Sequence, residues 1–247
     1  MPSLLEFHEV CAQNSKAEFL HDFSLQIEAG QSVALIGTPN TGAGLPLYLA
    51  NQMTFTDSGE IKIFEKNLNE YAAHEIFQLR AQVPLIQGEP VFLNNVPMHN
   101  NLQLPLLYHT NLDPTEIKER LTQANQLLGI HNIANQLPAL FEKTLQKKLA
   151  IARAIAMQPK MMMLEQPTWN LRPPDRPLLV KVLKDLRQHH QTTLFLATND
   201  FGLAEQVADI VCLFDNGRVI AQGSPKDVKK EQTKHPKIWG TLEIRAL

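Results

Sequence analysis

Hydrophobic and polar positions alternate along this chain between a strand-like and a helix-like period. Short, largely apolar runs at residues 3–10, 18–28 and 31–37 predict β-strands, and residues 58–68 predict a further strand pair or an edge strand. Strands that alternate with helices are typical of an α/β protein that contains a parallel sheet. The pattern therefore predicts this fold class before any motif is considered.

Residues 87–140 interrupt this rhythm. Prolines and asparagines are frequent in the first half of the stretch, and a helix is expected in the second half. Asp113 occupies the expected N-cap, Pro114 the first helical position, and Glu116 follows three residues after the cap, which is a capping-box arrangement. This change in composition and periodicity predicts an inserted helical subdomain.

The alternation of strands and helices resumes after this insertion. The predicted elements are, in order, a helix at residues 145–156, a buried strand at 160–168, an amphipathic helix at 178–186, a strand at 192–200 and a hairpin at 210–223. Asn216 and Gly217 suit the positive φ angles of a tight turn within the hairpin. Met161, Met162 and Met163 are explained most simply as part of the buried strand, not as a metal site.

Composition narrows the possible functions. The chain has 247 residues, of which 44% are hydrophobic and 19% charged, and its formal net charge is -2. This balance is typical of a globular protein with a large core, and it does not favour nucleic acid as a partner. No apolar run approaches the roughly 18 residues of a membrane-spanning helix, and the first residues lack the pattern of a signal peptide. Cys11 and Cys212 lack the spacing of metal ligands. We therefore expect a reduced, cytosolic protein, and any role at a membrane is expected to go through a partner.

A glycine-containing segment follows the predicted strand at residues 31–37. In the sequence LIGTPNTGAGLPL, four residues separate Gly37 from Gly42, as in phosphate-binding loops. Two glycines alone are a weak signal, because any strand-to-helix turn can contain them. The candidate loop comprises Gly37, Thr38, Pro39, Asn40, Thr41, Gly42, Ala43, Gly44 and Leu45.

Two longer stretches place this loop in a family. The first, at residues 147–168, is KKLAIARAIAMQPKMMMLEQPT and resembles the ATP-binding subunit of ABC transporters from the end of the signature motif through Walker B. The second, at residues 194–225, is LFLATNDFGLAEQVADIVCLFDNGRVIAQGSP and resembles the switch region and closing hairpin of that family. The resemblance implies a P-loop NTPase-like ABC ATPase fold with a RecA-like core, an antiparallel β subdomain and a helical subdomain. It divides a single domain, residues 1–247, into a core lobe at 1–86 and 141–224, a helical subdomain at 87–140 and a C-terminal tail at 225–247.

Within this family, residues 85–110 and the tail most resemble the ATPases of Mla or MCE-type lipid transporters. The sequence that carries this narrower resemblance is LIQGEPVFLNNVPMHNNLQLPLLYHT, together with the residues that follow IAQGS. The resemblance implies an integral-membrane permease, an MCE-type lipid-transfer protein and a second ABC subunit, in a homodimer or heterodimer, as partners. It also implies a peripheral position at the cytoplasmic face of the inner (cell) membrane.

The resemblance makes the departures in the phosphate loop informative. Family members carry a lysine at the position of Ala43 to offset phosphate charge, and a hydroxyl at the position of Gly44 to ligate magnesium. Their fourth loop position is usually glycine, whereas this chain has Asn40 preceded by Pro39, which lacks an N–H group. We therefore predict no cofactor, and we expect ATP and magnesium only if the degenerate site retains weak binding.

The other catalytic positions depart from the family pattern as well. The resemblance places Glu165 at the magnesium-supporting aspartate, Gln166 at the general base and Asn199 at the switch histidine. The signature Leu-Ser-Gly-Gly-Gln falls on Phe141, Glu142, Lys143, Thr144 and Leu145. Among the positions that matter for catalysis, only Gln87 is unchanged. Because loss of a general base alone slows a reaction by typically about 10²–10⁴-fold, we expect no ATPase activity.

Two alternatives to an inactive transporter subunit stay open at this level. In the first, the chain hydrolyses ATP slowly because a displaced lysine, such as Lys143 or Lys147, reaches the phosphates near a dimer partner. In the second, the chain is a soluble scaffold that uses the ABC fold away from any membrane.

The retained segment after Gln87 points to a docking function. In this family, a groove between the core lobe and the helical lobe receives a short cytoplasmic helix of the permease. The apolar residues that we predict to form this surface are Phe92, Leu93, Val96, Met98, Leu102 and Leu106. The alternative is that these side chains pack inside the protein.

Overall fold

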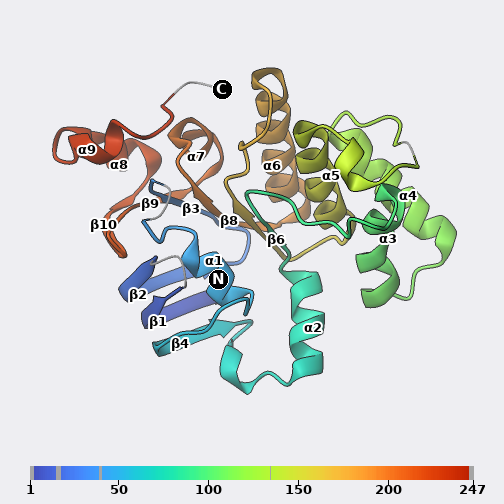
Figure 1. The fold of residues 1–247 in the computed structure, drawn as a ribbon. Helices are drawn as coiled ribbons and strands as arrows, with labels where there is room; N and C mark the ends of the chain where they lie inside the picture. The colour runs from blue at the N-terminus through green and yellow to red at the C-terminus, as the bar shows by residue number, and fades with distance from the viewer. Residues whose placement is uncertain (1–2, 15–17, 39–40, 134, 245–247) are drawn as a thin grey trace.

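The computed structural model describes residues 3–14, 18–38, 41–133 and 135–244 of the chain. A six-stranded sheet stands in the middle of the molecule, with a four-stranded antiparallel sheet on one side and most of the helices on the other (Figure 1). This arrangement is the α/β architecture with an antiparallel β subdomain that the sequence predicts.

The central sheet has the strand order β10-β9-β3-β8-β7-β6. Its strands are β3 (Ser32–Ile36), β6 (Leu85–Ile86), β7 (Met161–Glu165), β8 (Thr193–Thr198), β9 (Ile210–Asp215) and β10 (Arg218–Gly223). All neighbouring strands pair in parallel except β9 and β10, which form the predicted hairpin. Asn216 and Gly217 have φ angles of 44° and 74° in its turn, as expected. Strands β3, β7 and β8 are buried on both faces, which explains their continuous apolar sequences.

Parallel pairing brings four segments that are distant in sequence to one edge of this sheet. Gln87 follows β6, Gln166 follows β7, Asn199 follows β8, and the loop that starts at Gly37 follows β3. Open α/β sheets bind their ligands at the carboxyl ends of the strands. The topology therefore assembles the candidate site at the expected edge.

The antiparallel sheet packs on the central sheet through aromatic side chains. Its strands are β1 (Ser3–Gln13), β2 (Phe19–Glu28), β4 (Ser58–Ile63) and β5 (Lys66–Asn67), in the order β2-β1-β4-β5. Phe7 contacts Phe195 of the central sheet and Phe23 contacts Phe214, with ring centroids 6.1 Å apart in each pair. Helix α1 (Leu45–Ala50) contributes to the same buried cluster and is thereby fixed at the end of the loop.

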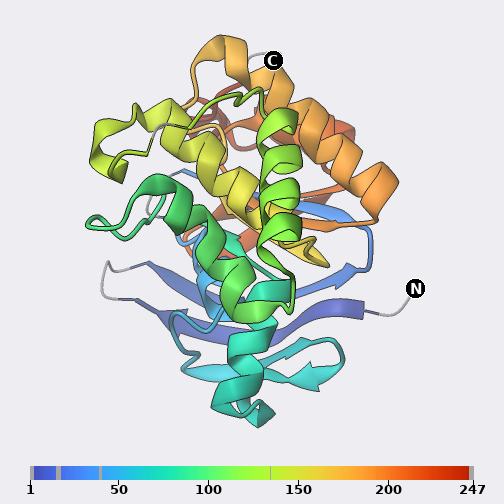
Figure 2. The same cartoon turned by 90° about the vertical axis from the view of Figure 1, so that its right-hand side faces the viewer.

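Eight further helices complete the described part of the chain. They are α2 (Ala73–Gln82), α3 (Met98–His109), α4 (Pro114–Leu127), α5 (Lys143–Ala156), α6 (Arg176–His190), α7 (Phe201–Val207), α8 (Pro225–Lys230) and α9 (Pro236–Trp239). Figure 2 shows α3, α4 and α5 grouped in front of the central sheet. No helix within the described ranges has the length and apolarity needed to cross a bilayer.

The predicted capping box at the start of α4 is confirmed. The Asp113 carboxylate accepts hydrogen bonds from the amides of Thr115 at 2.7 Å and Glu116 at 3.0 Å, and the Glu116 carboxylate accepts one from the Asp113 amide at 2.8 Å. Helix α3, by contrast, is absent from the sequence prediction. Pro105 inside it obscured the helical period, although Met98, Leu102 and Leu106 recur every four residues on one buried face.

One buried cluster joins the predicted core lobe to the predicted helical subdomain. It contains Met162 and Leu196 of the sheet, Ile151 of α5 and Leu102 of α3. Helix α5 packs both on the sheet and on α3 and α4. Because α5 contacts both the predicted core lobe and the predicted helical subdomain, the division at residues 87–140 stays a prediction.

The C-terminal segment folds back onto the end of β8. The Glu243 amide donates to the Asn199 carbonyl at 2.9 Å, and the Glu243 carbonyl accepts from the Gly202 amide at 3.3 Å. Arg176 of α6 donates to the Glu243 carboxylate at 2.9 Å. The residues predicted as a tail therefore cover the switch segment.

Candidate functional site

The loop after β3 folds onto itself. Its positions Pro39 and Asn40 lie outside the described residues. The Thr38 carbonyl accepts two hydrogen bonds from Thr41, one from the hydroxyl at 2.7 Å and one from the amide at 3.3 Å. A Cβ atom on Gly37 would lie 2.7 Å from the Thr41 hydroxyl oxygen. Gly37 is therefore required for this close approach, independently of any bound phosphate.

The amides at the start of α1 are already used or absent. The Leu45 amide donates to the Gly42 carbonyl at 3.0 Å, and the Leu47 amide donates to the Gly44 carbonyl at 3.1 Å. Pro46 between them has no N–H group. Helix N-termini bind phosphate through free amides that point at the ligand. The first three residues of α1 offer none.

Glu165 at the end of β7 is held by polar partners. Its Oε2 atom accepts hydrogen bonds from the Tyr48 hydroxyl at 2.7 Å and from the Gly88 amide at 3.0 Å. Burial, together with this bond, raises the pKa of Tyr48, so the phenol stays protonated and continues to donate. A Cβ atom added to Gly44 would lie 3.0 Å from Glu165 Oε1. The longer carboxylic side chain at 165 and the missing side chain at 44 are therefore complementary in space.

Gln166 connects the ends of β7 and β8. Its φ angle is 43°, in the left-handed region, and its Oε1 atom accepts hydrogen bonds from the Thr198 hydroxyl and the Asn199 amide, both at 3.3 Å. The backbone amide of Gln166 donates to the Ala197 carbonyl at 2.8 Å. The amide side chain at the position of the general base thus has a structural role in joining the two strand ends.

A cavity of about 170 Å³ opens between the loop and the ends of β7 and β8. Gly37, Thr38 and Gly44 of the loop line it, together with the carboxylates Glu18 and Glu165. Among the residues that the structure describes, none that lines the cavity is a lysine, arginine or histidine. No group of three or more His, Cys, Asp or Glu side chains suited to a metal ion occurs in the described ranges. The predicted phosphate-loop residues thus meet Glu165 and Gln166 at one cavity whose fixed charges are negative.

The predicted signature residues lie apart from this cavity, at the N-terminus of α5. Glu142 is the N-cap residue of α5 and its side chain makes no capping bond. The Lys143 ammonium is 3.6 Å from the Glu89 carboxylate, and both side chains are exposed. The Thr144 hydroxyl donates to the Asn170 carbonyl at 2.7 Å.

Lys147 lies in the interior of the protein. Its side chain has no exposed surface, and its ammonium donates to the carbonyls of Gln87 at 2.9 Å, Gly88 at 3.0 Å and Glu165 at 3.3 Å. The Lys147 ammonium is therefore not available to a phosphate near a dimer partner. The pattern of α5 contained the signal, because Lys147 precedes Ile151 by four residues on its buried face.

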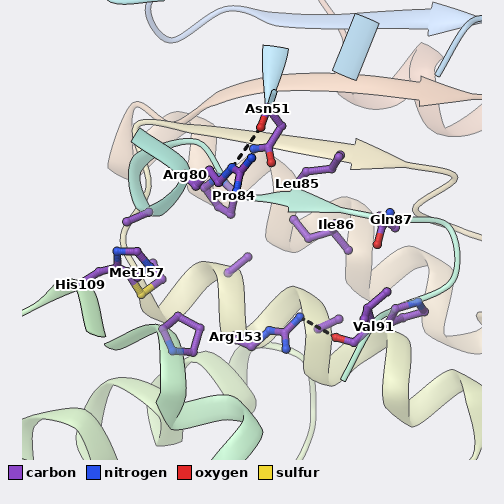
Figure 3. A pocket seen from close by; sticks show the side chains of 15 residues that line it. Asn51, Arg80, Pro84, Leu85, Ile86, Gln87, Val91, His109, Arg153 and Met157 are labelled. Atoms are coloured by element: carbon purple, nitrogen blue, oxygen red, sulfur yellow. Dashed lines mark hydrogen bonds between the residues drawn. The ribbon is translucent and has the colours of Figure 1, made fainter. Parts of the chain in front are cut away.

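A second, larger cavity lies on the other side of the Gln87 segment. It has a volume of about 250 Å³ and is a groove between that segment, α2, α3 and α5 (Figure 3). Arg80 donates to the Asn51 carbonyl at 3.1 Å, and Arg153 donates to the Val91 carbonyl at 3.1 Å. No aspartate or glutamate is among the described residues that line the groove. Within that part of the chain, no carboxylate of the groove therefore neutralises the two guanidinium groups.

The predicted docking residues are mostly not available at that groove. Phe92, Met98 and Leu102 are buried, and Leu106 is buried with them in the cluster that joins α3 to the sheet. Leu93 is 52% exposed. The expectation that Phe92, Met98 and Leu102 form an exposed docking surface is wrong. Helix α3 turns Met98 and Leu102 toward the core, and the Phe92 ring lies under the Arg153 guanidinium.

The comparisons with known proteins decide the family. Residues 20–169 match the family model described as ABC transporter. The chain belongs to the ABC transporter family. This membership agrees with the central sheet, the loop after β3 and the resemblance of residues 147–168 and 194–225 to that family.

Two curated relatives of the ABC transporter family cover nearly the whole chain. The methionine import ATP-binding protein MetN 1 of Yersinia pestis bv. Antiqua is 26% identical over 238 residues, which are 96% of this chain and 68% of MetN 1. The glutamine transport ATP-binding protein GlnQ of Geobacillus stearothermophilus is 26% identical over 235 residues, which are 94% of this chain and 96% of GlnQ.

A solved ABC transporter cassette confirms the fold. The dimeric structure of a bacterial cassette superposes with a TM-score of 0.83 at 20% identity, and the match covers 90% of this chain and 99% of the cassette. The predicted ABC ATPase fold is therefore correct.

Proposed function

We propose that this chain is a catalytically degenerate ABC subunit whose work is structural or regulatory. The observation that carries the proposal is the cavity at the loop after β3, where the charged side chains among the described lining residues are the carboxylates Glu18 and Glu165. A triphosphate brings several negative charges, and no lysine at position 43 offsets them. Attraction for phosphate is therefore replaced by repulsion.

Four further features of the residues present do not fit magnesium and ATP. Gly44 has no hydroxyl to ligate the ion, and the Glu165 oxygen bonded to Tyr48 and Gly88 has lost part of its capacity for a metal. The first amides of α1 are bonded internally. Gln166 cannot accept a proton from an attacking water. Each departure removes a different contribution, so no single compensation restores the site.

Pairing with a second ABC subunit does not complete the site. In this family, the nucleotide lies between the phosphate loop of one subunit and the signature of the other. Glu142 adds a negative charge at the signature position and is exposed at the start of α5. We therefore propose that the chain contributes neither half of a working site, in a homodimer or in a heterodimer.

Nucleotide is expected to leave the thermal stability of the protein unchanged. A ligand that binds only the folded state at micromolar affinity raises stability by about 4 kcal/mol at millimolar concentration. We expect no shift of the melting temperature between buffer and millimolar Mg-ATP, measured by differential scanning fluorimetry. A saturable upward shift would show that the cavity holds nucleotide in spite of its carboxylates.

We further propose that the groove beside Gln87 docks a cytoplasmic segment of a membrane permease. Val91, at 64% exposure, supplies an apolar wall, and Arg80 and Arg153 supply two cationic groups without a carboxylate at the groove. An apolar segment that carries an acidic residue fits such a surface, because opposite charges guide and orient association. This docking would hold the chain at the cytoplasmic face of the membrane.

Val91→Asp is expected to weaken association with membranes that contain the partner by about tenfold or more, because the new carboxylate is desolvated in the interface. The measurement is the membrane-bound fraction of the purified variant after flotation with native membranes. Leu127→Asp is the matched control, since Leu127 is an exposed leucine of α4 at 41% exposure that does not line the groove. Equal binding of Val91→Asp and wild type would contradict docking at this groove.

For the transported substrate, our first hypothesis is lipid, in an Mla or MCE-type assembly with a permease and a lipid-transfer protein. The resemblance of residues 85–110 supports it. A second candidate is amino-acid import, supported by the names of the relatives MetN and GlnQ at 26% identity. Purification of the tagged chain from membranes, with its partners identified, separates the two. An MCE-type protein in the complex supports the first hypothesis, and an amino-acid permease supports the second.

A further inference from the structure

A lysine inside the protein lies between the two cavities. Lys147 has no exposed surface, and its three hydrogen bonds all go to backbone carbonyls. The carbonyl of Glu165 belongs to the end of β7, and those of Gln87 and Gly88 belong to the segment that follows β6. One side chain of α5 therefore binds both strand ends.

Gly88 is held from both sides of its backbone. Its carbonyl accepts from Lys147 at 3.0 Å, and its amide donates to the Glu165 carboxylate at 3.0 Å. The same carboxylate oxygen accepts from Tyr48 at 2.7 Å. The segment is thus tied to α5 by a cation and to β7 by an anion, without any bound ligand.

Two carboxylates offset part of the cost of burying the Lys147 ammonium. Burial lowers the pKa of Lys147 to about 8, while Glu165 of β7 and Glu89 of the following segment raise it. Tyr48 of α1 is the other titratable group bonded to Glu165, and its raised pKa keeps it neutral. Glu165, which stands at a metal-supporting position in the family, therefore has a cation of the protein itself as its neighbour.

The groove is bounded by the elements that Lys147 joins. Ala150, Arg153 and Ala154 of α5 line one wall, one to two turns after Lys147, and Gln87 and Val91 line another. Fixing the Gln87–Gly88 segment against α5 sets the spacing of these walls. Farther along α5, Arg153 adds another hydrogen bond between this helix and the segment that follows Gln87, because it donates to the Val91 carbonyl.

We propose that Lys147 is a positioning residue that locks the Gln87–Gly88 segment against β7 and α5, so that the groove is preformed without nucleotide. The inference rests on the proposed function only where it assigns the groove to docking. The lock itself is a property of the isolated chain. It makes this subunit a rigid adaptor, because side chains of the chain itself hold the segment that joins the sheet to α3.

The test compares amide hydrogen exchange in the nucleotide-free full chain. Lys147→Met keeps the apolar stem and removes the ammonium, which leaves three buried carbonyls without a donor. We expect exchange of the amides at residues 87–97 to rise at least tenfold, with a smaller rise in β7 and β8. Lys148→Met is the matched control, because the Lys148 ammonium bonds Asp175 at 3.2 Å instead of the segment. We expect this control to change exchange at 87–97 less than threefold.

A conservative variant gives a readout that a merely space-filling side chain would not change. Lys147→Arg keeps a cation that can donate to the same three carbonyls, whereas Lys147→Met keeps only the apolar stem. We expect exchange at residues 87–97 in Lys147→Arg to stay within about threefold of wild type, measured under the same conditions.

Two results would overturn the lock. The first is unchanged exchange at residues 87–97 in Lys147→Met, or a rise that is uniform over the whole core. The second is exchange at residues 87–97 in Lys147→Arg that is as fast as in Lys147→Met. If Lys147→Met fails to fold, the exchange of wild type in the segment decides, because a lock requires protection there at least equal to that of the ends of β7. ATP hydrolysis or the absence of docking would refute the proposed function and leave these results unaffected.

Discussion

The purified protein is expected to hydrolyse Mg-ATP no faster than background. Gln166 replaces the general base, which alone slows the reaction by about 10²–10⁴-fold, and the cavity carries Glu18 and Glu165 where phosphate charge needs a cation. The measurement is phosphate release over hours at millimolar Mg-ATP, with and without a permease partner. Turnover on the order of 1 s⁻¹, typical of a working enzyme, would refute the proposal.

Restoring two motif residues is expected to leave the protein inactive. Ala43→Lys with Gln166→Glu returns the charge and the base, but the amides at the start of α1 and the signature residues stay as they are. Gly44→Ser alone brings its Cβ to 3.0 Å from Glu165 Oε1, so a hydroxyl at this position requires Glu165→Asp as well. Full activity from the first pair would show that the other departures matter little.

Leu102→Asp is expected to destabilise the protein strongly. The side chain is 1% exposed and lies in the cluster that joins α3 to the sheet, so the substitution leaves a buried carboxylate without a partner and removes apolar contacts. We expect a loss of about 4 kcal/mol or more, against a total stability of about 5–15 kcal/mol for a typical domain. The measurement is urea denaturation followed by circular dichroism.

Leu93→Asp is the matched control for that substitution. Leu93 is 52% exposed and belongs to the same predicted docking set, so its carboxylate remains in water. We expect a change of stability within about 0.5 kcal/mol. Equal stabilities of Leu102→Asp and Leu93→Asp would show that α3 does not direct the Leu102 row into the core.

The sequence alone determined five of the six central strands, all except β6, together with the capped helix at Asp113 and the turn at Asn216. These features depend on local chemistry: an apolar run long enough for a strand, a carboxylate at a helix start, and residues that tolerate positive φ angles. The motif positions Gly37, Gln87 and Gln166 also followed from the sequence, because the resemblance fixes which strand precedes each of them.

The tertiary structure alone decided which way side chains point and which groups neutralise them. Leu102 was expected at a surface and lies in the core, because a proline-containing helix turns its row inward. Lys147 was expected near a partner and lies inside, because three carbonyls from two strand ends converge on it. Burial and charge compensation depend on contacts between residues far apart in the sequence, and no local period encodes them. The contact between Gly44 and Glu165 also depends on the tertiary structure. The two residues are 121 positions apart in the sequence, and the parallel sheet brings them together.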